Sequence, residues 1–292
     1  MIDQIDALKT VDNPFVTNNP TSWCPGCGNF SILDTLNKTL FDVGLKPQDV
    51  LLVSGIGQAA KLPHYIHAHG LNTLHGRALP SALGAHVANN TLKIILNSGD
   101  GDTYGEGGNH LMHNIRRNID IVHIVHNNQV YGLTKGQGSP TTPLGQITRL
   151  QFDGMRSEEI RPLALAISLG CGFVARSFSG DSEHLGEMIK AAMDYKGYAL
   201  IDVMQPCVSF NKINTFKWYK DRAFKLPDDY DPTDKIKAFE MAQMFGDEGI
   251  PMGILFKENK SDFMARIPHI TKPLVLYDRK PDDIEKLLDG MI

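Results

Sequence analysis

Two short polar sequences could together hold a metal ion. Gly-Asp-Gly-Asp occupies residues 99–102 and Asn-Asn occupies 127–128, and each follows an apolar run. If both runs are neighbouring parallel strands, the two loops lie side by side, and Asp100 and Asn128 present oxygen ligands of the kind that Mg²⁺ prefers. The glycines leave room for a phosphate, and a helix expected to begin near Gly105 adds free N–H groups. The residues therefore predict a magnesium–diphosphate site.

The cysteines suggest a second kind of chemistry. The chain has four, Cys24, Cys27, Cys171 and Cys207. A C-x-x-C pair such as 24–27 indicates metal, cluster or redox chemistry rather than a disulfide framework in a reducing compartment. Cys171 lies between a predicted helix and strand and is expected to be a small buried residue. From the residues alone, the pair could also be half of a zinc site or a redox pair.

The elements that position these residues alternate along the chain. Each apolar run reads as a strand buried on both faces and closed by loop residues, with a helix candidate between runs. This order predicts an α/β fold with a doubly wound, mostly parallel sheet, which binds ligands beyond the carboxyl ends of its strands. The predicted strands are 51–53, 93–96, 121–125 and 199–203, and the helix candidates are 80–90, 105–117, 162–169 and 181–193.

The pattern changes near Ala223. A loop rich in Pro, Asp and Tyr at 226–232 leads to a helix candidate at 235–245 and then to sequence punctuated by Gly and Pro. A chain of 292 residues accommodates one large α/β domain and an extension. We therefore predict a diphosphate-binding domain at 1–222, which includes the N-terminal CxxC segment, and a C-terminal extension at 223–292.

Charge and hydropathy exclude several classes of partner. Acidic residues outnumber basic ones by 33 to 29, which gives no reason to expect a nucleic acid or an anionic membrane. The N-terminus lacks the basic start and apolar run of a signal peptide. No apolar stretch approaches the roughly 20 residues that a membrane span needs. The sequence predicts a cytoplasmic protein with no nucleic-acid or membrane partner.

Seven short motifs follow one another along the chain. They are WCPGCG at 23–28, SGIG at 54–57, HGRALP at 75–80, GDGD at 99–102, GNH at 108–110, RRN at 116–118 and YGLTKGQ at 131–137. In these motifs, over roughly residues 20 to 225, the chain resembles the β subunit of 2-oxoacid:ferredoxin oxidoreductases, whose cofactor is thiamine diphosphate. The resemblance implies a thiamine diphosphate-binding fold and coenzyme A-dependent oxidative decarboxylation of a 2-oxo acid, with electrons passing through a 4Fe-4S cluster to ferredoxin.

The resemblance assigns roles to individual residues. It implies that Asp100, Asn128 and the carbonyl of Val130 bind Mg²⁺. Lys61 could pair with the distal carboxylate of 2-oxoglutarate, which favours that substrate over pyruvate. The alternative for each implied cation is a solvated loop residue. The implied cofactor contacts are Ile56, Gly57, Gln58, Ala59, His75, Gly101, Asp102, Gly132 and Leu133, and the implied catalytic residues are Lys61, His75, Arg77 and Lys135.

The cluster is where the chain departs from the family. The family uses the CPGCG pair, a cysteine directly after the Ile-Gly of the next loop, and a late cysteine, and cluster iron usually takes four thiolates. Here Gln58 occupies the second of these places. His67 or His69 could complete the set, since imidazole replaces thiolate in some clusters. Otherwise a non-protein or partner ligand completes it, or the cluster is labile or absent. The matching thiolates are those of Cys24, Cys27 and Cys207.

The resemblance also implies that the site is shared between subunits. The glutamate that activates the aminopyrimidine ring would come from an α subunit, in a dimer of αβ heterodimers that is inactive without α. One alternative is a non-oxidative thiamine diphosphate subunit of the decarboxylase or transketolase kind, without a cluster, and Gln58 favours it. The other is a non-catalytic scaffold, which the intact loops at 99–102 and 127–128 speak against.

Overall fold

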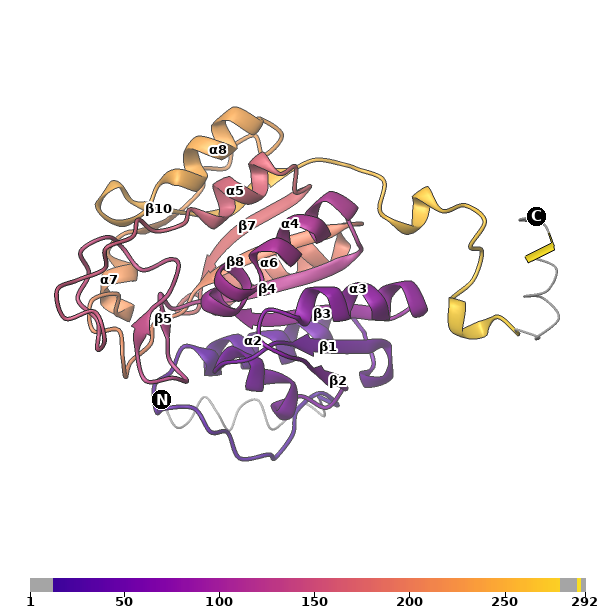
Figure 1. Cartoon of the computed structure of the whole chain (residues 1–292), viewed down its shortest axis with the longest axis horizontal. Helices are drawn as coiled ribbons and strands as arrows, with labels where there is room; N and C mark the ends of the chain where they lie inside the picture. The colour runs from indigo at the N-terminus through magenta and orange to yellow at the C-terminus, as the bar shows by residue number, and fades with distance from the viewer. Residues whose placement is uncertain (1–12, 279–287, 290–292) are drawn as a thin grey trace.

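An eight-stranded sheet runs through the centre of the chain (Figure 1). The computed structural model describes residues 13–278 and 288–289. Neighbouring strands from β2 to β7 in the sheet are parallel, whereas β10 is antiparallel to β7 and parallel to β9. The strand order is β2 (His69–Asn72), β1 (Val50–Ser54), β3 (Lys93–Gly99), β4 (Ile121–Asn127), β8 (Tyr198–Met204), β7 (Phe173–Phe178), β10 (Ile250–Lys257) and β9 (Ala223–Lys225).

Helices cover both faces of the sheet, so the predicted doubly wound α/β fold is confirmed. One face carries α2 (Asn29–Asp42) and α6 (Ser182–Asp194). The other carries α3 (Ala78–Ala88), α4 (Gly108–Arg117), α5 (Pro162–Ser168) and α8 (Lys235–Gln243). The shorter elements are η2 (Pro47–Asp49), η3 (Ala59–Tyr65), η4 (Gly101–Glu106), β5 (Val130–Tyr131), β6 (Gln137–Gly138), α7 (Phe216–Lys220), η5 (Gly246–Glu248), η6 (Met264–Arg266) and η7 (Leu274–Leu276).

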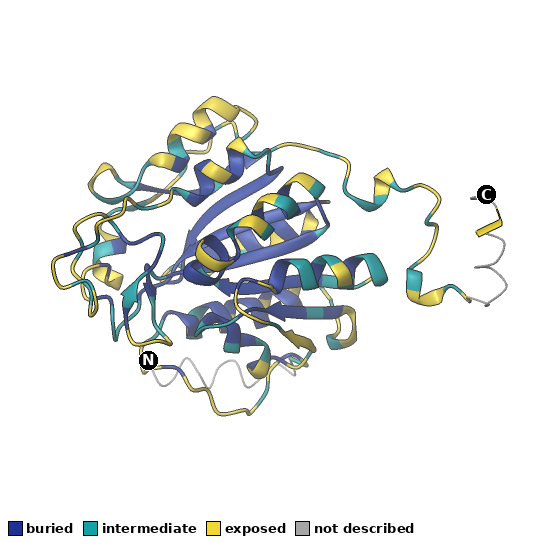
Figure 2. Cartoon of the chain, in the orientation of Figure 1, coloured by how far each residue is buried: buried dark blue, intermediate teal, exposed yellow. Residues whose placement is uncertain are grey.

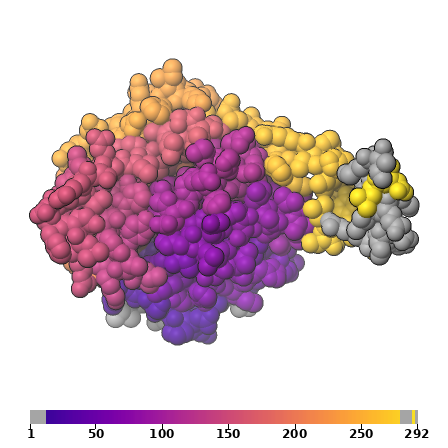
Figure 3. Space-filling view, in the orientation of Figure 1, coloured from indigo at the N-terminus to yellow at the C-terminus, as the bar shows by residue number. Residues whose placement is uncertain are grey.

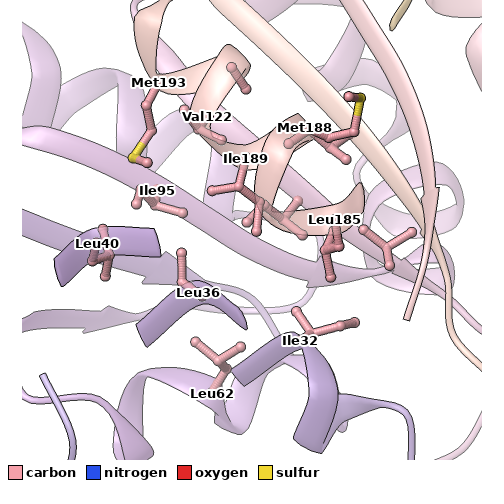
Figure 4. Packing of buried hydrophobic residues seen from close by; sticks show 14 of the residues in the cluster. Ile32, Leu36, Leu40, Leu62, Ile95, Val122, Leu185, Met188, Ile189 and Met193 are labelled. Carbon is pink, nitrogen blue, oxygen red and sulfur yellow. The ribbon is translucent and has the colours of Figure 1, made fainter. Parts of the chain in front are cut away.

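Strand β4 shows why continuous apolar runs become central strands. All of its residues are buried, and alternate side chains point to opposite faces of the sheet. Val122 and Ile124 belong to the core beneath α2 and α6, whereas Ile121 and Val125 belong to the core beneath α4 and α5. Figure 4 shows the first core, in which side chains of α2 and α6 lie in one cluster with Ile95 and Val122 of the sheet. The apolar run therefore supplies both cores.

Polar side chains set where the helices begin and end. Asp181 caps α6 by accepting a hydrogen bond from the backbone N–H of His184, at 3.1 Å. Asn118 ends α4 in the left-handed conformation, with φ of 54°. Its side-chain oxygen accepts a hydrogen bond from the backbone N–H of Tyr198, at 3.0 Å. One residue thus ends α4 and ties it to the start of β8.

Some elements differ from their prediction. The stretch after Asp100 forms the π-helical turn η4, and α4 begins at Gly108 rather than near Gly105. Strand β2 was not predicted, because its four residues are exposed and show no apolar pattern. The segment after the predicted boundary at 222 contributes β9 and β10 to the same sheet. The boundary itself stays a prediction.

The chain beyond β10 leaves the sheet. Figure 3 shows this described C-terminal segment projecting past the main body, and η7 within it contacts α3. Figure 2 shows the contrast between the buried central strands and this mostly exposed segment. Within residues 13–278 and 288–289, no helix is long and apolar enough to cross a membrane.

Buried His123 in β4 generates a prediction about stability. Its ring nitrogens contact Ser98 Oγ at 2.7 Å and the Tyr198 hydroxyl at 2.5 Å. Burial, aided by nearby His126, lowers the pKa of His123 from 6.5 to about 3. Below about pH 6.5 the unfolded chain binds this proton and the folded chain does not, so acid destabilises the fold.

We expect acid to lower the free energy of unfolding less in His123→Gln than in the unmodified chain. Between pH 6.5 and 5, the decrease should be about 2 kcal/mol smaller for His123→Gln, as measured by urea unfolding. Equal pH slopes for the two chains would contradict the prediction.

Candidate cofactor-binding site

The carboxyl ends of β3 and β4 bring the two polar sequences together. These strands are parallel neighbours, and Gly99 at the end of β3 pairs with His126 near the end of β4. The residues directly after them, 100–102 and 127–128, therefore lie at the same edge of the sheet. This is the edge at which parallel α/β sheets bind ligands.

Asp100 is a buried carboxylate held by hydroxyl groups. Its Oδ2 accepts hydrogen bonds from Ser139 Oγ at 2.5 Å and Thr141 Oγ1 at 2.7 Å. Burial raises the pKa of Asp100 to about 6, although these two hydrogen bonds oppose the rise. No lysine or arginine in the described part of the chain forms an ion pair with it. A buried carboxylate without a cation fits the binding of a divalent metal ion.

Hydrogen bonds orient the side chains of the asparagine pair. Asn128 Oδ1 accepts a hydrogen bond from the Val130 N–H at 3.1 Å, and its amide nitrogen donates to Gln205 Oε1 at 3.0 Å. Asn127 donates to both oxygens of Asp202, each at 3.2 Å. The amide oxygen of Asn128 thus lies on the side of Val130, whose carbonyl is the third implied ligand.

Asp102 joins neighbouring loops through hydrogen bonds to one carboxylate oxygen. Its Oδ1 accepts hydrogen bonds from His75 Nδ1 at 2.7 Å, the Gly76 N–H at 2.8 Å and the Ile56 N–H at 3.2 Å. This contact places a proton on His75 Nδ1 and leaves Nε2 as the free ring nitrogen. Gly55 admits the carboxylate, since a Cβ at that position would lie 2.0 Å from Asp102 Oδ2.

These groups surround one pocket. The pocket is also lined by residues without a predicted role, Gly99, Tyr131 and Thr134. Three implied catalytic residues are not on its wall. Lys61 is half-buried in η3, and Arg77 and Lys135 are exposed. The predicted residues on the wall are Ile56, Gly57, Gln58, Ala59, His75, Asp100, Gly101, Asp102, Asn128, Val130, Gly132 and Leu133.

A second, smaller pocket adjoins the first. Its lining includes Cys24, Cys27 and Cys207. Burial raises the pKa of Cys27 to about 11, and the negative charges of Cys207 and Cys24 contribute to the rise. No three His, Cys, Asp or Glu side chains in the described ranges are close enough to hold a single metal ion.

The fourth cysteine is a small buried residue, as predicted, and the two candidate histidines lie away from the cysteine pocket. Cys171 is buried in the core beneath α4 and α5, where its thiol donates to the Phe173 carbonyl at 3.3 Å. His67 and His69 are exposed and do not line the cysteine pocket. The ring of His67 instead contacts the Pro14 carbonyl at 3.0 Å.

Sequence reasoning missed the hydroxyl groups beneath the site. Ser139 and Thr141 belong to a run, Ser-Pro-Thr-Thr at 139–142, that follows the YGLTKGQ motif. Besides holding Asp100, Thr141 donates to Asn127 Oδ1 at 3.0 Å, so the loop joins both strand ends. The cluster of hydroxyls was a usable signal, but only the fold shows that the loop returns under Asp100.

Comparison with known proteins agrees with this geometry. Residues 54–203 match the family described as "Thiamine pyrophosphate enzyme, C-terminal TPP binding domain", and 207–272 match the family of the C-terminal part of the pyruvate ferredoxin oxidoreductase beta subunit. The chain is 46% identical to the 2-oxoacid:ferredoxin oxidoreductase subunit beta of Saccharolobus solfataricus, with 91% of this chain and 95% of the relative covered. It is 31% identical to the 2-oxoglutarate synthase subunit KorB of Archaeoglobus fulgidus, with 92% and 95% covered.

A solved structure shares the whole architecture. It is described as "2-oxoglutarate:ferredoxin oxidoreductase from Magnetococcus marinus with 2-oxoglutarate, coenzyme A and succinyl-CoA bound", and matches with a TM-score of 0.88 and 31% identity over 94% of each chain. The fold and the matched domain define a thiamine diphosphate-binding domain of an enzyme. Within that class, the chain belongs to the family of 2-oxoacid:ferredoxin oxidoreductase β subunits. The resemblance seen in the motifs is confirmed, and the chain is an oxidoreductase subunit that works with an α partner.

Gly55→Ala tests the wall built around Asp102. Its new methyl group would displace the Asp102 carboxylate and weaken the contacts to His75, Gly76 and Ile56. We expect a loss of about 1–3 kcal/mol in the free energy of unfolding, measured by urea denaturation.

Gly108→Ala is the matched control, because a Cβ there meets nothing within 4 Å. It should be neutral or slightly stabilising, since alanine favours a helix over glycine. Equal stabilities of the two variants would show that the space at Gly55 is not restricted.

Proposed function

We propose that this β subunit binds thiamine diphosphate through Mg²⁺ and, with its α partner, catalyses the coenzyme A-dependent oxidative decarboxylation of 2-oxoglutarate. Electrons leave through a 4Fe-4S cluster to ferredoxin. The sites proposed are the two adjoining pockets, the larger for the cofactor and the smaller for the cluster.

One observation carries the proposal: the two pockets share a wall. Gln58, Asn128 and Gly132 line both of them. A buried carboxylate without a cation faces one side, and three cysteines face the other. A decarboxylation that delivers electrons to a cluster needs the two groups to be neighbours, and this wall supports that arrangement.

Asp100, Asn128 and the carbonyl of Val130 would hold Mg²⁺. Glycines at 101 and 132 would let the diphosphate approach the backbone, and at Gly101 a Cβ would lie 2.2 Å from the Tyr131 ring. When bound, thiamine diphosphate supplies the electron sink for loss of carbon dioxide from a 2-oxo acid. His75 is oriented by Asp102, so that Nε2 is available to accept or return a proton at the substrate.

Two lines of support favour 2-oxoglutarate. Relatives such as the A. fulgidus protein are named 2-oxoglutarate synthase subunits, and the M. marinus structure has 2-oxoglutarate and coenzyme A bound. Lys61 is the implied partner of the distal carboxylate. It is half-buried, and its backbone N–H donates to the Gln58 carbonyl at 3.4 Å, so it lies close in sequence and space to the shared wall. We further propose a cytoplasmic dimer of αβ heterodimers.

The most direct test is turnover by the reconstituted enzyme. The chain is co-expressed with its α subunit under anaerobic conditions, and coenzyme A-dependent reduction of ferredoxin or a viologen dye is measured with a panel of 2-oxo acids. We expect turnover by the complex and none by the chain alone. Asp100→Ala should reduce turnover by at least about a thousandfold, because the metal loses its charged ligand.

The exposed Asp229→Ala serves as control and should retain full activity. Turnover by the chain alone, or by the Asp100→Ala complex, would contradict the proposal. Decarboxylation without electron transfer, in protein that contains no iron, would favour a non-oxidative thiamine diphosphate enzyme.

Lys61→Met tests the choice of substrate. If the ammonium group pairs with the distal carboxylate, kcat/KM for 2-oxoglutarate should fall about tenfold to a hundredfold, whereas that for pyruvate should not fall. Lys190→Met, at an exposed position of α6, should change neither value. An equal fall for both substrates would exclude recognition of the distal carboxylate by Lys61.

A further inference from the structure

Gln58 lines both pockets, and hydrogen bonds hold its backbone carbonyl in place. Its carbonyl accepts hydrogen bonds from Trp23 Nε1 at 2.8 Å and from the Lys61 N–H at 3.4 Å. The first of these ties Gln58 to the segment that carries Cys24 and Cys27. Gly57, with φ of 124°, turns the chain immediately before it. Gln58 lines both pockets from this position.

The side-chain oxygen of Gln58 is buried and has no hydrogen-bond partner among the described residues. A buried amide oxygen without a partner costs about 1–3 kcal/mol, so such an atom calls for a ligand. The cysteine pocket offers three thiols, and none of its lining residues is a histidine, aspartate or glutamate. A fourth protein ligand from this wall must therefore come from an amide or a hydroxyl.

The other polar side chains of this pocket are already engaged. Asn128 and Gln205 bond to one another, and Gln205 also donates to Cys27 Sγ at 3.5 Å. Asn29 Oδ1 contacts His126 Nδ1 at 2.8 Å, so only its amide nitrogen, a donor, is free. Ser209 Oγ donates to Cys24 Sγ at 3.0 Å. Gln58 Oε1 is the carbonyl oxygen that remains.

We infer that the cluster site of this chain is built from the thiolates of Cys24, Cys27 and Cys207, with Gln58 Oε1 as the ligand of the fourth iron. The inference rests on the proposed function, because it takes the cysteine pocket to hold a 4Fe-4S cluster. Gln58 also lines the cofactor pocket, so the iron that it binds would be on the side of the cofactor.

The glutamine in place of the family's cysteine has a chemical consequence. An amide oxygen is a neutral, hard ligand, whereas cluster iron prefers the anionic, soft thiolate. The fourth iron is therefore the one most easily lost. Ferricyanide removes one electron from the 4Fe-4S core of charge 2+ and becomes ferrocyanide. A 3Fe-4S core of charge 1+ and one free Fe²⁺ result, so charge and iron balance.

The test uses the αβ complex, purified anaerobically and treated with one equivalent of ferricyanide. Released Fe²⁺ is measured with a chelator, and the 3Fe-4S core by electron paramagnetic resonance. We expect the unmodified complex to release about one Fe²⁺ per cluster. Gln58→Cys should release it about tenfold more slowly, and Gln58→Ala faster than the unmodified complex. Gln243→Cys, the same exchange at an exposed site in α8, should behave like the unmodified complex.

Equal iron retention in the unmodified complex and Gln58→Cys would overturn the inference while leaving the proposed function intact. Equal rates of release in the unmodified complex and Gln58→Ala would also overturn it, because the amide would then not be a ligand. Absence of iron and of a visible absorption band from every variant would overturn both the inference and the proposed electron path. Coenzyme A-dependent turnover, measured on the same samples, separates these cases.

Discussion

The buried carboxylate of Asp100 is the constraint on which the site depends. A charge at the end of a buried strand is stable only with hydrogen bonds and a counterion. Ser139 and Thr141 provide the hydrogen bonds from a loop that returns under the strand ends. The side-by-side placement of β3 and β4 brings the oxygen of Asn128 to the same pocket. The rest of the sheet holds these two strand ends in register.

A second carboxylate organises the opposite wall. Asp102 gathers the loops that carry Ile56, His75 and Gly76 through one oxygen, and the SGIG loop continues directly into Gln58. The wall that shapes the cofactor pocket is thus continuous with the wall of the cysteine pocket. A change at Gln58 therefore alters the lining of both pockets.

Much of this arrangement could be predicted from the sequence. The strands that became β1, β3, β4 and β8 are continuous apolar runs, and GDGD and NN end two of them. Local patterns therefore predicted these strands and the meeting of the two polar loops at one sheet edge. The support of Asp100 by Ser139 and Thr141 depends on the path of a distant loop, which no local pattern encodes. The same holds for β10, which joins the sheet antiparallel to β7. The sequence showed that Gln58 departs from the family, but its free oxygen could be seen only in the fold.

Asp100 and Asn128 are proposed to hold the metal that anchors the cofactor. A crystal structure of the αβ complex with thiamine diphosphate and Mn²⁺ in place of Mg²⁺ tests this assignment directly, because manganese is located by anomalous scattering. With data collected above the manganese edge and below the iron edge, we predict a manganese peak at about 2.1–2.2 Å from Asp100, Asn128 Oδ1 and the Val130 carbonyl, in contact with the diphosphate. Manganese at another place, or a diphosphate bound away from these three ligands, would contradict this assignment.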